Sequence, residues 1–98
     1  MLWVPNSTSN TVTVVRATGG LAGTVIATLS GNGLNSPYCA AFDGERILVT
    51  SLLGGVSLWK ATDLTPIGMS SDFALVRGVC SDGLNFWIAT YNSELLRF

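Results

Sequence analysis

Residue types that could carry out chemistry are scarce in this chain of 98 residues, which contains no histidine. Histidine is the commonest general base, a frequent metal ligand and the base of the ordinary serine triad. The remaining candidates are two cysteines and six acidic side chains. No cluster of these groups has the spacing of a catalytic site, so the sequence predicts a protein that is not an enzyme.

The two cysteines, Cys39 and Cys80, are 41 residues apart and are expected on strands that present them in the same direction. Such a pair of thiols could form a disulfide or bind a metal. Two cysteines do not make a disulfide framework, however, and free cysteine ordinarily serves as a small apolar side chain of the core. We therefore expect both to be buried, and we predict no metal and no other cofactor.

Two carboxylates, Asp43 and Asp82, occupy equivalent positions in a repeated segment. Repeated acidic side chains at one face of a protein could bind Ca²⁺. Each aspartate is followed by glycine, though, and the Asp-Gly pair is a preferred tight turn for reasons of its backbone alone. The turn is the interpretation that we favour.

Aromatic side chains are the remaining candidates for binding, because their rings stack on sugar faces and anchor protein interfaces. Trp3 and Trp87 share a repeat position that is expected to lie in the core. Tyr38 and Tyr91 lie near the ends of expected strands, where loops bind ligands, and Trp59 is expected on the opposite side of its strand from the core residue next to it. Tyr38, Tyr91 and Trp59 are therefore the predicted ligand-binding residues.

The composition excludes several classes of partner. The net charge is −1 and the five basic residues are scattered, so no basic stripe is present for nucleic acid or for an anionic membrane surface. No apolar run approaches the length of a membrane span. Only 11% of the residues are charged and 48% are hydrophobic, which indicates that another chain or another copy covers part of the surface.

The chain repeats itself. An apolar triplet occurs at Leu2–Val4, Ile47–Val49 and Phe86–Ile88, with spacings of 45 and 39 residues, and residues 37–49 as a whole match residues 76–88. Periods of this length mark a supersecondary unit that buries its apolar face by stacking on copies of itself. The residues expected to pack between the repeats are Trp3, Val14, Phe42, Leu48, Leu58, Val79 and Trp87.

Each repeat reads as four short strands separated by Gly-, Asn- and Ser-rich turns, and no segment keeps a helical period. Four antiparallel strands in about 40 residues indicate a propeller blade. The predicted fold class is therefore all-β, built from four-stranded antiparallel β-propeller blades. A single segment holds a partial blade of three strands at 1–29, a blade of four strands at 37–68, whose last strand is expected at residues 64–67, and a partial blade of three strands at 74–98. About four to eight blades close a propeller, so the propeller is incomplete within this chain.

The motifs resemble those of a known group. The order P-Y-x-x-A-F-D-G-x-x-I-x-V-T at residues 37–50, followed by V-S-L at 56–58, is similar to the blades of bacterial β-propellers of the YVTN and virginiamycin B lyase-like type. The segment N-S-T-S-N-T-V-T-V at residues 6–14 is similar to a turn of the same repeats. The resemblance implies the blade. It also implies that the histidine used by the lyase members would have to lie outside this segment.

The function that we expect is a non-catalytic scaffold in a larger or assembled propeller that binds a protein or a surface glycan. An enzyme of the lyase-like group, with its catalytic residues elsewhere, is one alternative. The other is a self-assembling structural subunit, including a virion-associated one. The expected partners are a protein or carbohydrate ligand and either copies of the chain or the rest of a longer propeller. The polar turns favour an extracellular, cell-surface or virion-surface location.

Overall fold

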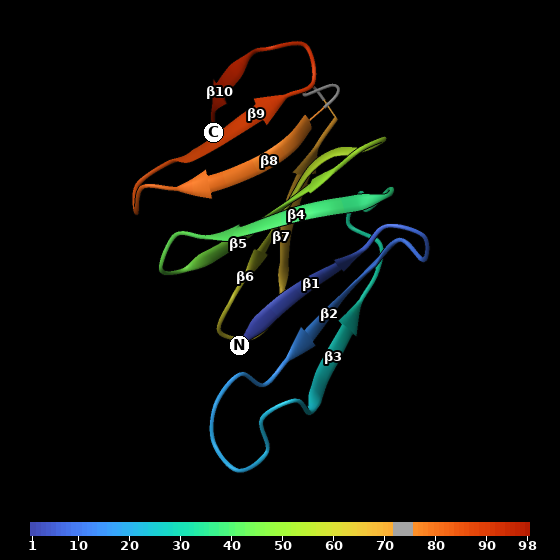
Figure 1. Cartoon of the computed structure of the whole chain (residues 1–98), viewed down its shortest axis with the longest axis vertical. Helices are drawn as coiled ribbons and strands as arrows, with labels where there is room; N and C mark the ends of the chain where they lie inside the picture. Colours follow the sequence, from blue (N-terminus) through green and yellow to red (C-terminus); the bar gives the residue numbers. More distant parts are fainter. Residues whose placement is uncertain (72–75) are drawn as a thin grey trace.

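The computed structural model describes residues 1–71 and 76–98 and folds them into three antiparallel sheets (Figure 1). Sheet 1 contains β1 (Leu2–Asn6), β2 (Thr11–Val15) and β3 (Val25–Leu29). Sheet 2 contains β4 (Pro37–Phe42), β5 (Arg46–Ser51), β6 (Gly55–Lys60) and β7 (Pro66–Ser70). Sheet 3 contains β8 (Val76–Ser81), β9 (Phe86–Thr90) and β10 (Leu95–Arg97).

The described residues contain no helix, and hence none long and apolar enough to cross a membrane. The prediction of an all-β fold is confirmed, as is the grouping of the strands into three, four and three. In every sheet, consecutive strands are hydrogen-bonded neighbours.

Two expected boundaries need comment. The last strand of the central repeat was expected to include Leu64, but β7 begins only at Pro66. Leu64 has a left-handed φ of 62°, and its N–H donates to the carbonyl of Lys60 at 2.9 Å, so the residue belongs to a turn. The expected partial blade at 74–98 begins outside the described residues, and sheet 3 is described from Val76 onward.

The Asp-Gly pairs form the turns from β4 to β5 and from β8 to β9. In each turn, one carboxylate oxygen of the aspartate (Asp43 or Asp82) accepts the N–H groups of the residues two and three positions later, over 2.6 to 2.9 Å. The glycines that follow have φ values of +104° (Gly44) and +93° (Gly83), a region that side chains with a Cβ rarely adopt. The turn interpretation of both aspartates is confirmed.

Sheet 2 is buried on both faces because it lies between sheets 1 and 3. Alternation along β5 sends Ile47 and Val49 toward sheet 1 and Leu48 toward sheet 3. The buried cluster on the sheet 1 side contains Val12, Leu34, Ile47, Val49, Trp59 and Ala61. The cluster on the sheet 3 side contains Leu48, Val56, Leu58, Val76, Phe86 and Ile88.

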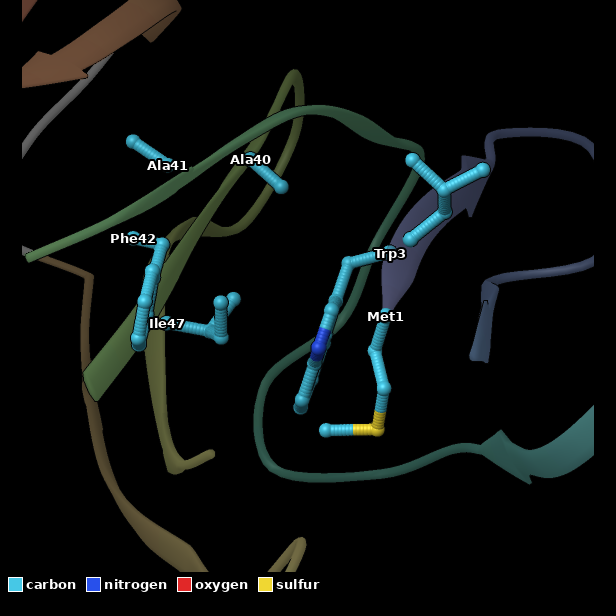
Figure 2. Close-up of a pocket in the computed structure, with 7 residues that line it drawn as sticks. Met1, Trp3, Ala40, Ala41, Phe42 and Ile47 are labelled. Carbon is cyan, nitrogen blue, oxygen red and sulfur yellow. The ribbon is translucent and has the colours of Figure 1, made fainter. Parts of the chain in front are cut away.

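Most of the expected packing residues lie in this core. Val14 and Leu48 are fully buried, and Leu58 is buried with 9% of its surface exposed. Trp3 and Val79 are partly buried and pack against the two clusters. Trp87 is half-buried and lies outside both clusters. The prediction for Phe42 was wrong, because its side chain is 55% exposed. It lies at the end of β4, where it lines an open hollow beside β1 instead of the sealed core (Figure 2).

Candidate functional site

The candidate site lies at the end of the sheets where β4 and β8 begin, which we call the tyrosine end. The register pairs Pro37 with Ser51 and Val76 with Thr90, so the starts of β4 and β8 lie beside the ends of β5 and β9. Tyr38 is the second residue of β4. β4 and β8 pack against each other across the two sheets (Figure 1).

Tyr91 is the most accessible aromatic ring of this end. It follows β9 directly and is 73% exposed, while Tyr38 is 56% exposed. The guanidinium carbon of Arg77, the second residue of β8, lies 5.1 Å from the centroid of the Tyr91 ring. This cation–π contact orients the ring. The tyrosine end therefore combines two open aromatic rings with a guanidinium, a set suited to stacking on a sugar or anchoring a protein loop.

A buried hydroxyl holds the two strands of the site together. Thr50 is fully buried at the end of β5, and its Oγ1 donates to the carbonyl oxygen of Arg77 over 2.6 Å. The same hydroxyl lies 3.4 Å from the carbonyl oxygen of Cys39. Because the bond links sheet 2 to sheet 3, it sets the position of Arg77 relative to β4. The bond thus connects β5, the hydrogen-bonded neighbour of the strand that carries Tyr38, to β8, the strand that carries Arg77.

Three asparagine side chains of the neighbouring loops are already hydrogen-bonded to other groups of the protein. Asn6 donates from Nδ2 to Oγ1 of Thr13 at 2.8 Å, and Asn10 Oδ1 accepts the N–H of Ser36 at 2.8 Å. Asn32 donates to the carbonyl of Leu58, on the neighbouring sheet, at 3.0 Å. Such bonds fix loop geometry and occupy groups that could otherwise reach a ligand. The aromatic rings and Arg77 remain the groups best suited to binding.

Trp59 does not belong to this surface. Its side chain is only 2% exposed and lies in the cluster between sheets 1 and 2. The centroids of the Trp59 and Trp3 rings are 6.1 Å apart, with an interplanar angle of 53°. A ring packed in this way has no face available for a ligand, so the interpretation of Trp59 as a binding residue is corrected to a core role. The residue does lie on the opposite side of β6 from Leu58, as expected.

The two cysteines are not bridged to each other. Both are free thiols; Cys39 is half-buried beside Thr50, and Cys80 is exposed beside Trp87. The expectation of two buried side chains is therefore wrong for Cys80. Among residues 1–71 and 76–98, no group of three cysteine or acidic side chains is close enough to hold a metal ion.

The aspartates of the two turns are held in their charged form. The pKa of Asp82 is lowered to about 2, first by the N–H of Asn85, then by the indole N–H of Trp87 and the N–H of Leu84. The indole nitrogen of Trp87 donates to Asp82 Oδ2 over 2.8 Å. Burial acts to raise the pKa of Asp43, but the N–H groups of its turn and the guanidinium of Arg46 at 2.9 Å lower it overall. Both carboxylates therefore stabilise their own turns by accepting the N–H groups within them.

Sequence reasoning missed Arg77 as part of the site. The signal was present in the repeat, because matching residues 37–49 to 76–88 aligns Arg77 with Tyr38. Equivalent positions on β4 and β8 therefore project from the same end of adjacent strands. The contact of Arg77 with Tyr91 depends on the fold of the β9–β10 turn, which the repeat does not determine.

Comparison with known proteins adds no family or relative to this picture. No family model matches the chain, and no curated protein matches it at a significant level.

Proposed function

We propose that the three sheets are blades of a β-propeller and that the chain is a non-catalytic binding module, with its ligand, a protein or a surface glycan, at the tyrosine end. The observation that carries the binding role is the exposure of Tyr38 on β4 and of Tyr91 after β9. The ring of Tyr91 contacts Arg77 of β8, and β8 packs against β4. The blade interpretation is supported by three antiparallel meanders that repeat the same order of strands and pack in chain order.

The outer faces support the view that further sheets cover this stack. Leu2 and Val4 on sheet 1 occupy the repeat positions of Ile47 and Val49 on sheet 2. The sheet 2 residues are at most 4% exposed, whereas Leu2 and Val4 are 56% and 43% exposed. The same repeat position is therefore apolar in both sheets but covered in only one of them. Another sheet of the same kind, from a copy of the chain or from a longer chain, fits that face.

The binding role is tested with two substitutions on the surface. Tyr91→Ala and Tyr38→Ala remove exposed rings, so folding should be retained. The free energy of unfolding should stay within about 0.5 kcal/mol of the wild-type value. The affinity for immobilised glycans or candidate surface proteins should fall at least about tenfold, because an aromatic anchor residue carries a large share of the binding energy. Leu84→Ala, at the opposite end of the sheets, is the matched control and should bind normally. Equal binding by all three variants would refute the site.

Assembly is tested by the mass of the native particle in solution, measured by light scattering. A discrete oligomer with about 20 to 30 strands would agree with the usual number of blades in a propeller. A monomer at every concentration would refute completion of the propeller by copies of this chain. In the oligomer, Leu2→Lys should shift the mass toward the monomer, because it places a charge on the outer face of sheet 1.

A further inference from the structure

The loop between β3 and β4 carries the chain from sheet 1 into sheet 2, and its sharpest bend is a turn at residues 31–34. The N–H of Leu34 donates to the carbonyl of Gly31 over 3.0 Å, which closes the turn. The two central residues, Asn32 and Gly33, have positive φ values of 49° and 81°. Such values are typical of a type I′ turn, for which Asn-Gly is a preferred pair. This is the only Asn-Gly pair in the sequence.

The side-chain amide of Asn32 does more than the turn requires. Its Nδ2 donates to the carbonyl oxygen of Leu58 on β6 over 3.0 Å. The register between β6 and β7 shifts directly after Leu58, so the amide meets the sheet where its strand pairing is irregular. Leu34, at the end of the turn, is buried in the cluster between sheets 1 and 2. The turn is therefore fastened at the place where these two sheets pack.

The glycine of the pair lies against a side chain of β7. A Cβ built on Gly33 would lie 2.6 Å from the terminal carbon of Met69 and 3.0 Å from its Cβ. Met69 therefore covers this part of the turn, and both Asn32 and Gly33 are half-buried although they lie in a loop. The folded chain thus restrains the side chain of the asparagine and covers the glycine that follows it.

We propose that Asn32 is a site of spontaneous deamidation that reacts when this loop opens. The backbone nitrogen of Gly33 attacks the side-chain carbonyl carbon of Asn32, and the bond from that carbon to Nδ2 breaks. Ammonia leaves with the proton that the Gly33 nitrogen loses, and a succinimide ring remains. Water then opens the ring to give aspartate or isoaspartate. Glycine favours the attack because it has no Cβ to obstruct it.

The product cannot restore the bond that held the loop closed. A carboxylate at position 32 has no hydrogen to donate, so it would place a negative charge against the carbonyl oxygen of Leu58. Isoaspartate also lengthens the main chain of the turn by one carbon atom. Deamidation therefore favours the open loop and weakens the junction of sheets 1 and 2. This inference does not depend on the binding role of the tyrosine end.

The reaction is followed in the intact chain by peptide mapping with mass spectrometry, in mildly alkaline buffer with and without denaturing urea. In urea, Asn32 should deamidate faster than any other asparagine. Folding should slow the reaction at Asn32 at least about tenfold, and much less at Asn35, which is exposed in the same loop. Equal rates at Asn32 with and without urea would overturn the proposal, and so would the absence of reaction there in urea.

Two variants of β7 test whether opening of this loop controls the reaction. Met69→Ala uncovers Gly33, whereas Ile67→Ala truncates a side chain of the same strand that is equally exposed, at 51%. Both variants should fold, because the two side chains lie at the surface. Only Met69→Ala should accelerate deamidation of the folded chain at Asn32, by severalfold. Equal rates in the two variants would overturn the role given to the loop.

The consequence of the reaction is tested with Asn32→Asp and Asn35→Asp, which add the same charge to the same loop. Asn32→Asp should raise the equilibrium constant of unfolding at least about tenfold, because it replaces a donor to the Leu58 carbonyl with a carboxylate. Asn35→Asp, at an exposed position, should change that constant by less than about threefold. Equal changes in the two variants would overturn the proposed effect on the loop.

Discussion

Two buried hydroxyls in sheet 2 differ in one respect, which gives a sharp test of how the sheets are held together. Thr50 and Ser57 are both fully buried, on β5 and β6. Thr50 Oγ1 donates to the carbonyl of Arg77 across the sheet interface at 2.6 Å. Ser57 Oγ has no hydrogen-bond partner among the described residues. The first hydroxyl should stabilise the fold, and the second should not.

The expected magnitudes follow from this difference. Thr50→Val preserves shape and strand propensity but removes the bond from the buried hydroxyl to the carbonyl of Arg77, which should cost about 0.5 to 1.5 kcal/mol. For a domain of this size, each kcal/mol corresponds to a change in Tm of about 4 to 8 °C. Ser57→Ala removes an unsatisfied polar atom at little loss of volume, so the free energy of unfolding should be unchanged or should rise by up to about 1 kcal/mol.

The assay is urea unfolding of the wild-type chain and both variants, followed by circular dichroism at equal protein concentration. The slopes of the unfolding transitions should agree, so that midpoints can be compared directly. If Ser57→Ala costs as much as Thr50→Val, the stabilising role assigned to the inter-sheet bond is wrong. A Thr50→Val chain as stable as wild type would refute it independently.

Three further predictions probe other parts of the fold, two of them with a control substitution. A Cβ at Gly55, where φ is +85°, would collide with a carbonyl oxygen of β7, so Gly55→Ala should lower the unfolding midpoint strongly. At the control position Gly44, φ is +104° and no atom lies within 4 Å of an added Cβ, so Gly44→Ala should lower the midpoint far less. Equal losses in the two variants would contradict this prediction. The pKa of Asp82 is lowered from 3.8 to about 2, so the stabilising contribution of its carboxylate is complete above pH 4 and is lost as the pH falls toward 2. In Asp82→Asn, the free energy of unfolding should therefore depend less on pH between 4 and 2. The same pH dependence in the variant and the wild type would contradict the assignment. Trp59→Ala should lower the free energy of unfolding, measured in urea, by about 3 to 5 kcal/mol. Leu84 is 82% exposed, so the control Leu84→Ala should change it by less than about 0.5 kcal/mol. Similar losses in the two variants would show that Trp59 is not a core residue.

Much of the fold was accessible from the sequence because its signals are local and repeated. Alternating apolar residues give strands, and Asp43 and Asp82 close hairpins with bonds that span only two or three residues. The repeat then assigns Leu48 and Leu58 to an interface, since an apolar face that recurs must be covered. These inferences hold because neither periodicity nor turn chemistry depends on distant parts of the chain.

The candidate site was only partly accessible. Tyr38 and Tyr91 were predicted near strand ends, and the structure leaves both exposed. The side of β6 on which Trp59 lies was predicted, but its burial was not, and Arg77 was not predicted. Periodicity tells which side of a strand a residue occupies and does not tell whether another sheet covers that side. Trp59 is buried because sheet 1 packs on its side of sheet 2.

The sequence by itself determined the strands, their turns and their grouping into three repeats, because spacing and side-chain period are properties of the chain alone. Only the tertiary structure decided which apolar faces are sealed. Stacking covers both faces of sheet 2 at β5 and β6. It leaves Leu2 and Val4 exposed on the outer face of sheet 1 and Phe42 exposed at the end of β4. It also brought Arg77 to Tyr91, since contacts between distant segments depend on packing across long stretches of sequence.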